Sequence, residues 1–179
     1  MSVGKFPVQQ YASPVILEAN GPAFSNTSAA HTLLTAAPTI PTGQFNAGDL
    51  LQLYVGLLFL NNSGATQTLT LKLLLGGTAI VNLVTAALAA SATTYNVIVK
   101  AAVLLGAGST NAVSELLVST SAATGTTAMS TFANPAQGSL AGLSGTLDIQ
   151  GTCSTGTTTT TVTPKSCAVL WIPGPGFVR

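Results

Sequence analysis

The side chains that could carry out chemistry are few and scattered along this chain of 179 residues. The single histidine is His31. The four carboxylates are spread over the whole sequence: Glu18, Asp49, Glu115 and Asp148. A glycosidase needs two carboxylates that meet across the substrate, and nothing in this spacing predicts such a pair. The sequence also lacks a G-x-S-x-G nucleophile elbow and a phosphate-binding loop. We therefore predict no catalytic residue and no enzyme.

The two cysteines, Cys153 and Cys167, bracket a threonine-rich segment between two expected strands. Cys153 has the alternation parity of Ile149, and Cys167 has that of Val169, so both are expected to face the core. A cross-hairpin disulfide would fit this parity and would stabilise the chain by roughly 3 kcal/mol for a loop of this length. Two buried, reduced thiols are the alternative. The cysteines and the distant His31 do not form a tetrahedral zinc set, and we predict no metal and no cofactor.

Three further side chains have structural interpretations. Trp171, the only tryptophan, shares the parity of Cys167 and is expected in the core before it is expected as a stacking platform for carbohydrate. Asp49 lies in a turn that leads into a strand, where a carboxylate can accept hydrogen bonds from nearby backbone N–H groups. His31 begins a short strand, and an ordinary, partly exposed histidine is expected there.

The composition points to a protein that works inside an assembly. Apolar residues make up 47% of the chain and charged residues 5%, with a net charge of +1. Nucleic-acid binding needs clustered cations, and docking on an anionic membrane needs a basic segment; neither is present. No apolar run reaches the roughly 20 residues of a membrane-spanning helix. Near-neutral proteins tend to associate, although a neutral monomer is the alternative.

The elements that must position these residues are β-strands. Residues 67–75 alternate leucines with Thr68, Thr70 and Lys72, which is the pattern of a half-buried strand. Gly76-Gly77 supplies the positive φ angles of a tight turn, and residues 78–84 follow as the partner strand. Residues 49–60 are apolar on both faces, which predicts a strand buried on two sides or facing a neighbouring subunit.

Further strands are expected along the chain, at residues 14–19, 31–40, 94–100, 112–121, 145–153 and 165–173. The one plausible helix, residues 85–92, is short and weak. About eight strands separated by turns predict an all-β protein, an antiparallel β-sandwich or barrel. Residues 120–144 are expected to form a long loop that is functional or packed against a partner.

The N-terminal residues 1–30 read as an extended arm that contains one short strand and several prolines. Its apolar side chains, and two on the outward parity of residues 49–60, are the candidate assembly contacts: Phe6, Tyr11, Ile16, Phe24, Tyr54 and Leu58. Such an arm can add backbone hydrogen bonds to the sheet edge of a neighbouring subunit; a disordered tail is the alternative. Residues 31–179 are expected to form the β-sandwich domain.

Residues 39–83, "TIPTGQFNAGDLLQLYVGLLFLNNSGATQTLTLKLLLGGTAIVNL", carry a family resemblance. An I-P segment leads to a GD-x-L strand, an N-x-x-G loop and a T-L-x-L-x-L-G-G-T-x-I hairpin. This pattern resembles jelly-roll structural proteins of tailed bacteriophages, which decorate heads, form head fibres or belong to tail appendages. The close resemblance covers about a quarter of the chain.

The resemblance implies a jelly-roll virion protein, assembled in the host cytoplasm and exposed on the particle surface. It implies a homotrimer that binds the major capsid protein or another virion protein, without catalysis. Two other functions fit the sequence. One is a trimeric jelly-roll protein of a cell or spore surface, although no Gly-X-Y stalk is present. The other is a carbohydrate-binding module for host attachment, which would require exposed aromatic residues such as an accessible Trp171.

Overall fold

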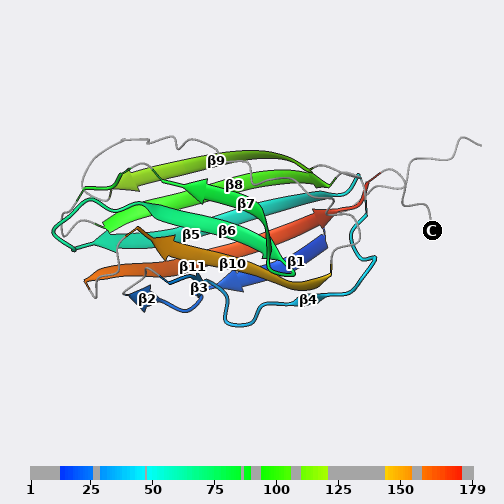
Figure 1. The fold of residues 1–179 in the computed structure, drawn as a ribbon, viewed down its shortest axis with the longest axis horizontal. Helices are drawn as coiled ribbons and strands as arrows, with labels where there is room; N and C mark the ends of the chain where they lie inside the picture. Colours follow the sequence, from blue (N-terminus) through cyan, green and yellow to red (C-terminus); the bar gives the residue numbers. More distant parts are fainter. Residues whose placement is uncertain are drawn as a thin grey trace, which may run out of the picture.

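The computed structural model describes residues 13–25, 29–46, 48–85, 87–89, 94–105, 110–120, 144–154 and 159–174, with the backbone alone for Ser13 and residues 110–120. All regular secondary structure in these ranges is β-strand. The strands form two antiparallel sheets that pack face to face (Figure 1). The predicted all-β, antiparallel sandwich is confirmed.

One long strand and one hairpin follow directly from the residue pattern. In β5 (Leu50–Asn61), the odd-numbered residues from Leu51 to Phe59 are buried and the residues between them are not. The predicted hairpin is formed by β6 (Leu69–Leu75) and β7 (Thr78–Val84). Gly76 and Gly77 have φ angles of 57° and 81°, and two consecutive positive φ angles are what a tight hairpin turn of this hand requires.

Each sheet joins strands that are far apart in the sequence. Sheet A has the order β1-β11-β5-β8-β9, and β2 also pairs with β11; the remaining bounds are β1 (Ser13–Ala19), β2 (Phe24–Ser25), β8 (Thr94–Leu105), β9 (Thr110–Thr120) and β11 (Thr160–Ile172). Sheet B has the order β3-β10-β6-β7, and β4 also pairs with β10; its other bounds are β3 (His31–Thr32), β4 (Thr39–Ile40) and β10 (Gly145–Cys153). In each sheet a strand from the N-terminal part of the chain pairs with one from the C-terminal part: β1 with β11 in sheet A, and β3 with β10 in sheet B. The β6–β7 hairpin lies beside β10 in sheet B. This strand order is the double Greek-key topology of a jelly roll, and β9 is an additional strand at the edge of sheet A.

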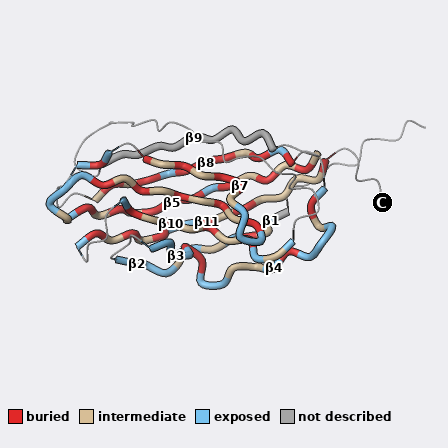
Figure 2. The backbone as a smooth tube through the Cα atoms, in the orientation of Figure 1, coloured by how far each residue is buried: buried red, intermediate tan, exposed pale blue. Residues whose placement is uncertain are grey.

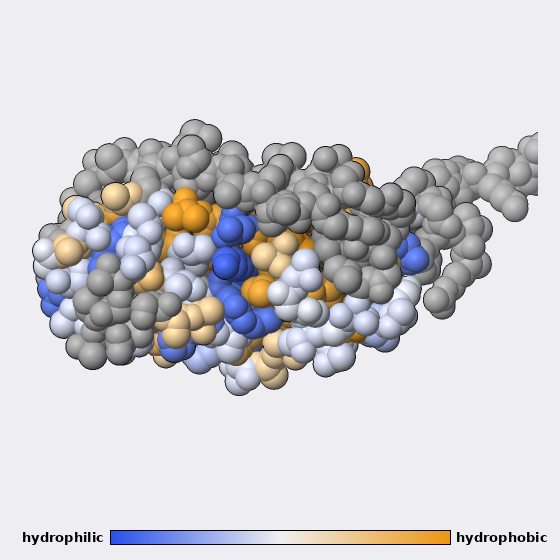
Figure 3. All heavy atoms as spheres, in the orientation of Figure 1, coloured by the Kyte–Doolittle hydropathy of each residue, from blue (hydrophilic) through white to orange (hydrophobic). Residues whose placement is uncertain are grey.

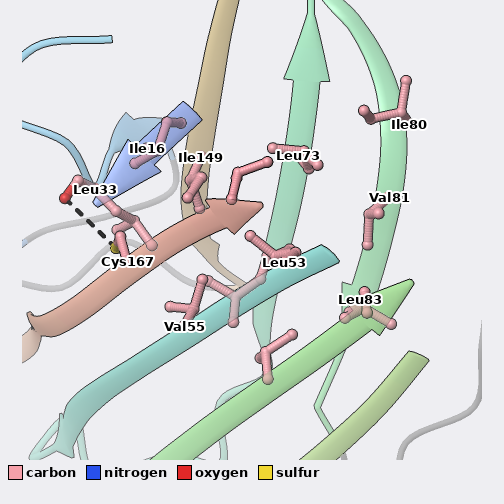
Figure 4. Packing of buried hydrophobic residues seen from close by; sticks show 14 of the residues in the cluster. Ile16, Leu33, Leu53, Val55, Leu73, Ile80, Val81, Leu83, Ile149 and Cys167 are labelled. Atoms are coloured by element: carbon pink, nitrogen blue, oxygen red, sulfur yellow. Dashed lines mark hydrogen bonds between the residues drawn. The ribbon is translucent and has the colours of Figure 1, made fainter. Parts of the chain in front are cut away.

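The core lies between the sheets and is built almost entirely from aliphatic side chains. Along each long strand the buried residues alternate with less buried ones (Figure 2), as expected when one face of a sheet packs on the other sheet. Figure 4 shows Leu53 and Val55 from sheet A near Leu73 and Ile149 from sheet B. Parity therefore decides which side chains of sheet A point outward.

The described part of the predicted arm belongs to the sandwich itself. Strand β1 pairs with β11 of the same chain, and Ile16 is 5% exposed within the core. The carboxylate of Glu18 accepts a hydrogen bond from the backbone N–H of Thr35 at 2.8 Å, which ties β1 to the segment between residues 32 and 39 that pairs at both ends with sheet B. Residues 1–12, where an arm stays a prediction, lie outside the described residues, so the division at residue 30 does not separate β1 from the domain.

Two other expected elements differ from the structure. Residues 31–40 form two short strands, β3 and β4, that pair with opposite ends of β10, because the segment between them leaves the sheet. The expected helix at 85–92 is wrong for the residues described there: Leu88 forms an antiparallel bridge with Gln67. Most of the expected loop at 120–144 lies outside the described residues.

The structure has the second of the two alternatives for the cysteines, two buried thiols. Cys153 and Cys167, both within the described residues, form no disulfide. The parity prediction holds, since both side chains are buried. However, Cys153 ends β10 in sheet B opposite Leu69, whereas Cys167 lies in β11 of sheet A opposite Val55. The two strands are consecutive in the sequence but belong to opposite sheets, so they make no hairpin for a disulfide to cross.

Candidate protein-binding surface

The outward side of sheet A carries many apolar side chains, among polar ones that include Gln52, Asn96 and Lys100. The outward-pointing residues of strands β1, β11, β5 and β8 form this side, and the strand register places them in rows across the sheet. We call this surface the outer apolar face; its members are Leu17, Leu50, Tyr54, Gly56, Leu58, Leu60, Ile98, Ala102, Leu104, Ala168, Leu170 and Ile172. An antiparallel sheet of a sandwich usually turns polar residues to water on this side, so the exposed large apolar side chains are the unusual feature of this face.

Several side chains of the face are well exposed. Leu17 is 78% exposed, Ile98 46%, Leu104 44% and Tyr54 38%. Exposure of single leucines is common in proteins, but a contiguous apolar patch marks an interaction site. Leu50 lies directly opposite Leu104, and Gly56 lies directly opposite Ile98, so each exposed residue of β8 has a partly exposed residue of β5 beside it.

A hollow of about 290 Å³ lies in the middle of the face. It is lined by Tyr54, Gly56, Ile98 and Ser166, with Val55 and Val99 at its floor. The hollow exists because Gly56 has no side chain: a Cβ there would lie 2.8 Å from the hydroxyl oxygen of Ser166. Lys100, opposite Tyr54 on β8, brings a positive charge to the neighbouring row.

On the outward side of sheet B, polar residues form a row that lies between apolar residues such as Leu74 and Val84. The row runs through Asn82, Lys72 and Gln150, which are paired residues on β7, β6 and β10. Asp148 accepts hydrogen bonds there from Gln150 Nε2 at 2.8 Å and from the hydroxyl of Thr32. Figure 3 shows hydrophilic residues as a stripe over the middle of this side. The two outer faces differ in that sheet A carries the exposed large apolar side chains of the described residues, whereas a polar row crosses sheet B.

Asp49 and Trp171 form a buried polar contact at the end of the sandwich. Asp49 is 1% exposed, and its carboxylate accepts hydrogen bonds from Trp171 Nε1 at 2.9 Å, Gly174 N at 2.8 Å and Asn46 N at 2.8 Å. The Trp171 ring packs edge-on against Phe45, with centroids 5.9 Å apart. The turn predicted around Asp49 is present, and Trp171 is a packed residue and no open platform for a sugar ring.

The other residues whose side chains could take part in a reaction are packed within the fold. His31 is half-buried and stacks on Phe24 with ring centroids 4.7 Å apart. Burial and, to a smaller extent, the nearby Glu18 carboxylate raise the pKa of the Cys167 thiol to about 12. A thiol with so high a pKa stays protonated at neutral pH and is a poor nucleophile. Within the described ranges, no three His, Cys, Asp or Glu side chains are grouped to hold a metal ion.

The candidate assembly contacts are found in different places. Tyr54 and Leu58 lie on the outer apolar face, as the two-sided apolar pattern of residues 49–60 predicted. Phe24 packs against the core of its own chain, while Phe6 and Tyr11 lie outside the described residues. Sequence reasoning missed Ile98 and Leu104, although their apolar character at outward positions of β8 was a usable signal.

No helix in the described part of the chain has both the length and the apolar character to cross a membrane.

Comparison with known proteins gives distant likenesses. No family model and no curated protein matches the chain. Among solved structures it is similar to the CBM2 module of the evolved Dit protein of Lactobacillus casei BL23 phage J-1, with 8% identity and a TM-score of 0.42 over 91% of this chain and 80% of that chain. It is similar to the infectious bursal disease virus Gx strain (14% identity, TM-score 0.40) and to the VP2 subviral particle of that virus (16%, 0.35), covering 99% of this chain and 38% of each of those chains. At these TM-scores the likenesses carry no argument about function.

Proposed function

We propose that this protein is a structural component of a virus particle, held in its assembly through the outer apolar face. The carrying observation is the place of the exposed large apolar side chains of the described residues: Leu17, Tyr54, Ile98 and Leu104 all lie on the outward side of sheet A, and none lies on sheet B. A lasting protein contact removes such apolar side chains from water, which is the main favourable term in association.

The virion part of the proposal is supported by two features of the chain itself. The strand order is that of a jelly roll, the fold of many viral capsid proteins. The motifs of residues 39–83 resemble jelly-roll proteins of tailed bacteriophages. A role in head decoration, a head fibre or a tail appendage follows from that resemblance, as does a position on the particle surface.

The carbohydrate-binding alternative is less well supported. It requires an accessible aromatic platform, and the indole of Trp171 is held between Phe45 and Asp49. The exposed aromatic on the outer apolar face is Tyr54, whose hydroxyl donates a hydrogen bond to Gln52 Oε1 at 3.4 Å and which has Lys100 opposite it, so this face offers a single ring for a sugar to stack on. We therefore retain the structural role.

The test is the protein composition of particles from the source of this chain. Particles purified on a density gradient are analysed by quantitative mass spectrometry beside the cell-surface fraction of the same culture. The proposal expects the chain in the particles at a fixed molar ratio to the major capsid protein. Its presence in the cell-surface fraction alone would refute the virion role and support the surface-protein alternative.

A matched pair of variants tests the role of the face. Tagged Ile98→Lys and Leu74→Lys chains are produced in host cells during particle assembly. Both substitutions place a lysine at a partly exposed, outward strand position, the first on sheet A and the second on sheet B. We expect incorporation of the Leu74→Lys chain at the unmodified level and loss of the Ile98→Lys chain. Equal incorporation of both variants would contradict the use of this face.

A further inference from the structure

We infer that the partner on the outer apolar face is a second copy of this chain, bound face to face about a two-fold axis close to Gly56 and Ile98. This inference rests on the proposed function, because it names the partner of the same surface. It replaces the trimer implied by the family resemblance with a dimer.

The size of the face fits such a dimer. Strand β5 is paired with β8 over the eleven residues from Leu50 to Leu60, which corresponds to about 36 Å at roughly 3.3 Å per residue. The three long strands β11, β5 and β8 span about 14 Å at roughly 4.8 Å per strand, and the seven-residue β1 adds a shorter strip about 23 Å long. The resulting area of about 630 Å² lies at the lower end of the roughly 600–1,000 Å² that each partner contributes to a stable interface.

The shape of the face limits what can cover it. A partner that uses the whole area must present a flat apolar surface of the same length, and a second sheet A meets that condition. Two sheets pack face to face with their strands at about 30° to each other. The core of this sandwich is already built in that way from the inward sides of sheets A and B.

The face is also complementary to itself. The hollow at Gly56 lies directly beside the exposed side chains of Tyr54 and Ile98. In an isologous contact the same patch meets its own copy. An axis that passes next to the hollow therefore places the Ile98 side chain of each copy against the hollow of the other, and the match is made twice.

Charge and symmetry favour a second copy over other partners. A chain with a net charge of +1 and 5% charged residues offers little overall repulsion between copies, and the charged side chain on the outward side of β8 is Lys100, whose long stem lets its ammonium reach water at the rim of a contact. The exposed large apolar side chains of the described residues, Leu17, Tyr54, Ile98 and Leu104, all lie on this one face. A three-fold ring needs two different contact surfaces on every subunit, whereas a two-fold dimer needs one.

The mass of the full chain in solution is the first test. Size-exclusion chromatography with light scattering should give twice the chain mass of 17.8 kDa. Ile98→Lys and, independently, Leu104→Lys should each halve that mass with an unchanged circular-dichroism spectrum. Leu74→Lys, on the outward side of sheet B, should remain dimeric. Two variants of the face are used so that a fold defect in one leaves the other informative.

Cross-linking locates the axis. Ile98→Cys should give a cross-linked dimer with a short bismaleimide, because residues beside a two-fold axis meet their own copies. The native Cys153 and Cys167 are buried, so they contribute little background. Leu74→Cys is the matched control and should give none. A dimer that cross-links equally through Leu74→Cys would overturn the assignment to sheet A.

The inference and the proposed function fail separately. A monomer or a trimer at high micromolar concentration, or a dimer that both lysine variants of the face leave intact, would overturn the inference. The presence of the chain in particles is measured on source material and does not depend on that result. A monomer that is nevertheless a particle component would leave the proposed function standing without the dimer.

Discussion

Replacing Asp49 by asparagine tests whether the buried carboxylate holds the end of the sandwich together. The carboxylate accepts three hydrogen bonds: Oδ2 from Trp171 Nε1 and Asn46 N, and Oδ1 from Gly174 N. Its side chain is 1% exposed, so water cannot replace a lost partner. An amide of the same size keeps the packing and changes only the charge and one acceptor.

The expected cost follows from the number of bonds. In the better orientation the amide oxygen keeps the bonds from Trp171 and Asn46, and its NH₂ group faces the N–H of Gly174. That bond to a charged acceptor is lost at roughly 1.5–3 kcal/mol, and the other two weaken because the acceptor is no longer charged. We expect the free energy of unfolding to fall by about 2–4 kcal/mol.

Urea denaturation followed by tryptophan fluorescence measures this cost directly, because Trp171 is the single tryptophan and donates to the mutated group. All samples are compared at one protein concentration, since association with a second copy would also stabilise the fold. The matched control is Asp148→Asn, whose half-exposed carboxylate bonds to Thr32 and Gln150. It should cost less than about 1 kcal/mol. Equal losses in the two variants would refute the reasoning.

Three further predictions concern the cysteines and the turns. Denatured protein without reductant should release two reactive thiols per chain, Cys153 and Cys167, and native protein at pH 8 close to none, because both are buried; no thiol after denaturation would restore the disulfide. The Cys167 pKa rises from 9.0 to about 12 on folding, so between these values the unfolded chain has lost a proton that the folded chain keeps. Stability should therefore fall as pH rises above 9, by up to about 1.4 kcal/mol per pH unit, and Cys167→Val should lose this slope; an unchanged slope would exclude the thiol. Gly76→Ala should destabilise by more than about 2 kcal/mol, because its φ is +57° and its Cβ would lie 2.4 Å from the Ser144 carbonyl oxygen. Gly64→Ala, with φ +77° and open space around the added Cβ, should cost about 1 kcal/mol; the same cost at both sites in thermal unfolding would contradict the steric argument.

Local alternation predicted the strands well because it reports directly which face a side chain occupies. Leu69 to Leu75 alternate in sequence and in burial, and Gly76-Gly77 makes the turn that its composition indicates. The outward apolar residues of β5 were likewise visible as a strand that is apolar on both faces. The part of the candidate surface that β5 contributes could thus be predicted from the residue pattern alone.

Long-range pairing was not predictable from the same pattern. Parity placed Cys153 and Cys167 toward the core correctly, but it carries no information on which sheet a strand joins. The bond between Asp49 and Trp171 joins residues 122 positions apart. At Leu88, a bridge to Gln67 overrides the helix preference of an alanine-rich segment.

The position of β11 in sheet A has a consequence for how the protein is made. This strand follows all the other described strands in the sequence, yet it lies between β1 and β5. During synthesis the earlier strands of sheet A therefore leave the ribosome without the strand that joins them. Folding dominated by such distant contacts is slow, and the waiting strands expose apolar surface. A chain that stops before β11 cannot complete sheet A, so it cannot display the continuous outer face. An assembly that binds the protein through that face would therefore not incorporate incomplete chains, because they lack the surface it binds.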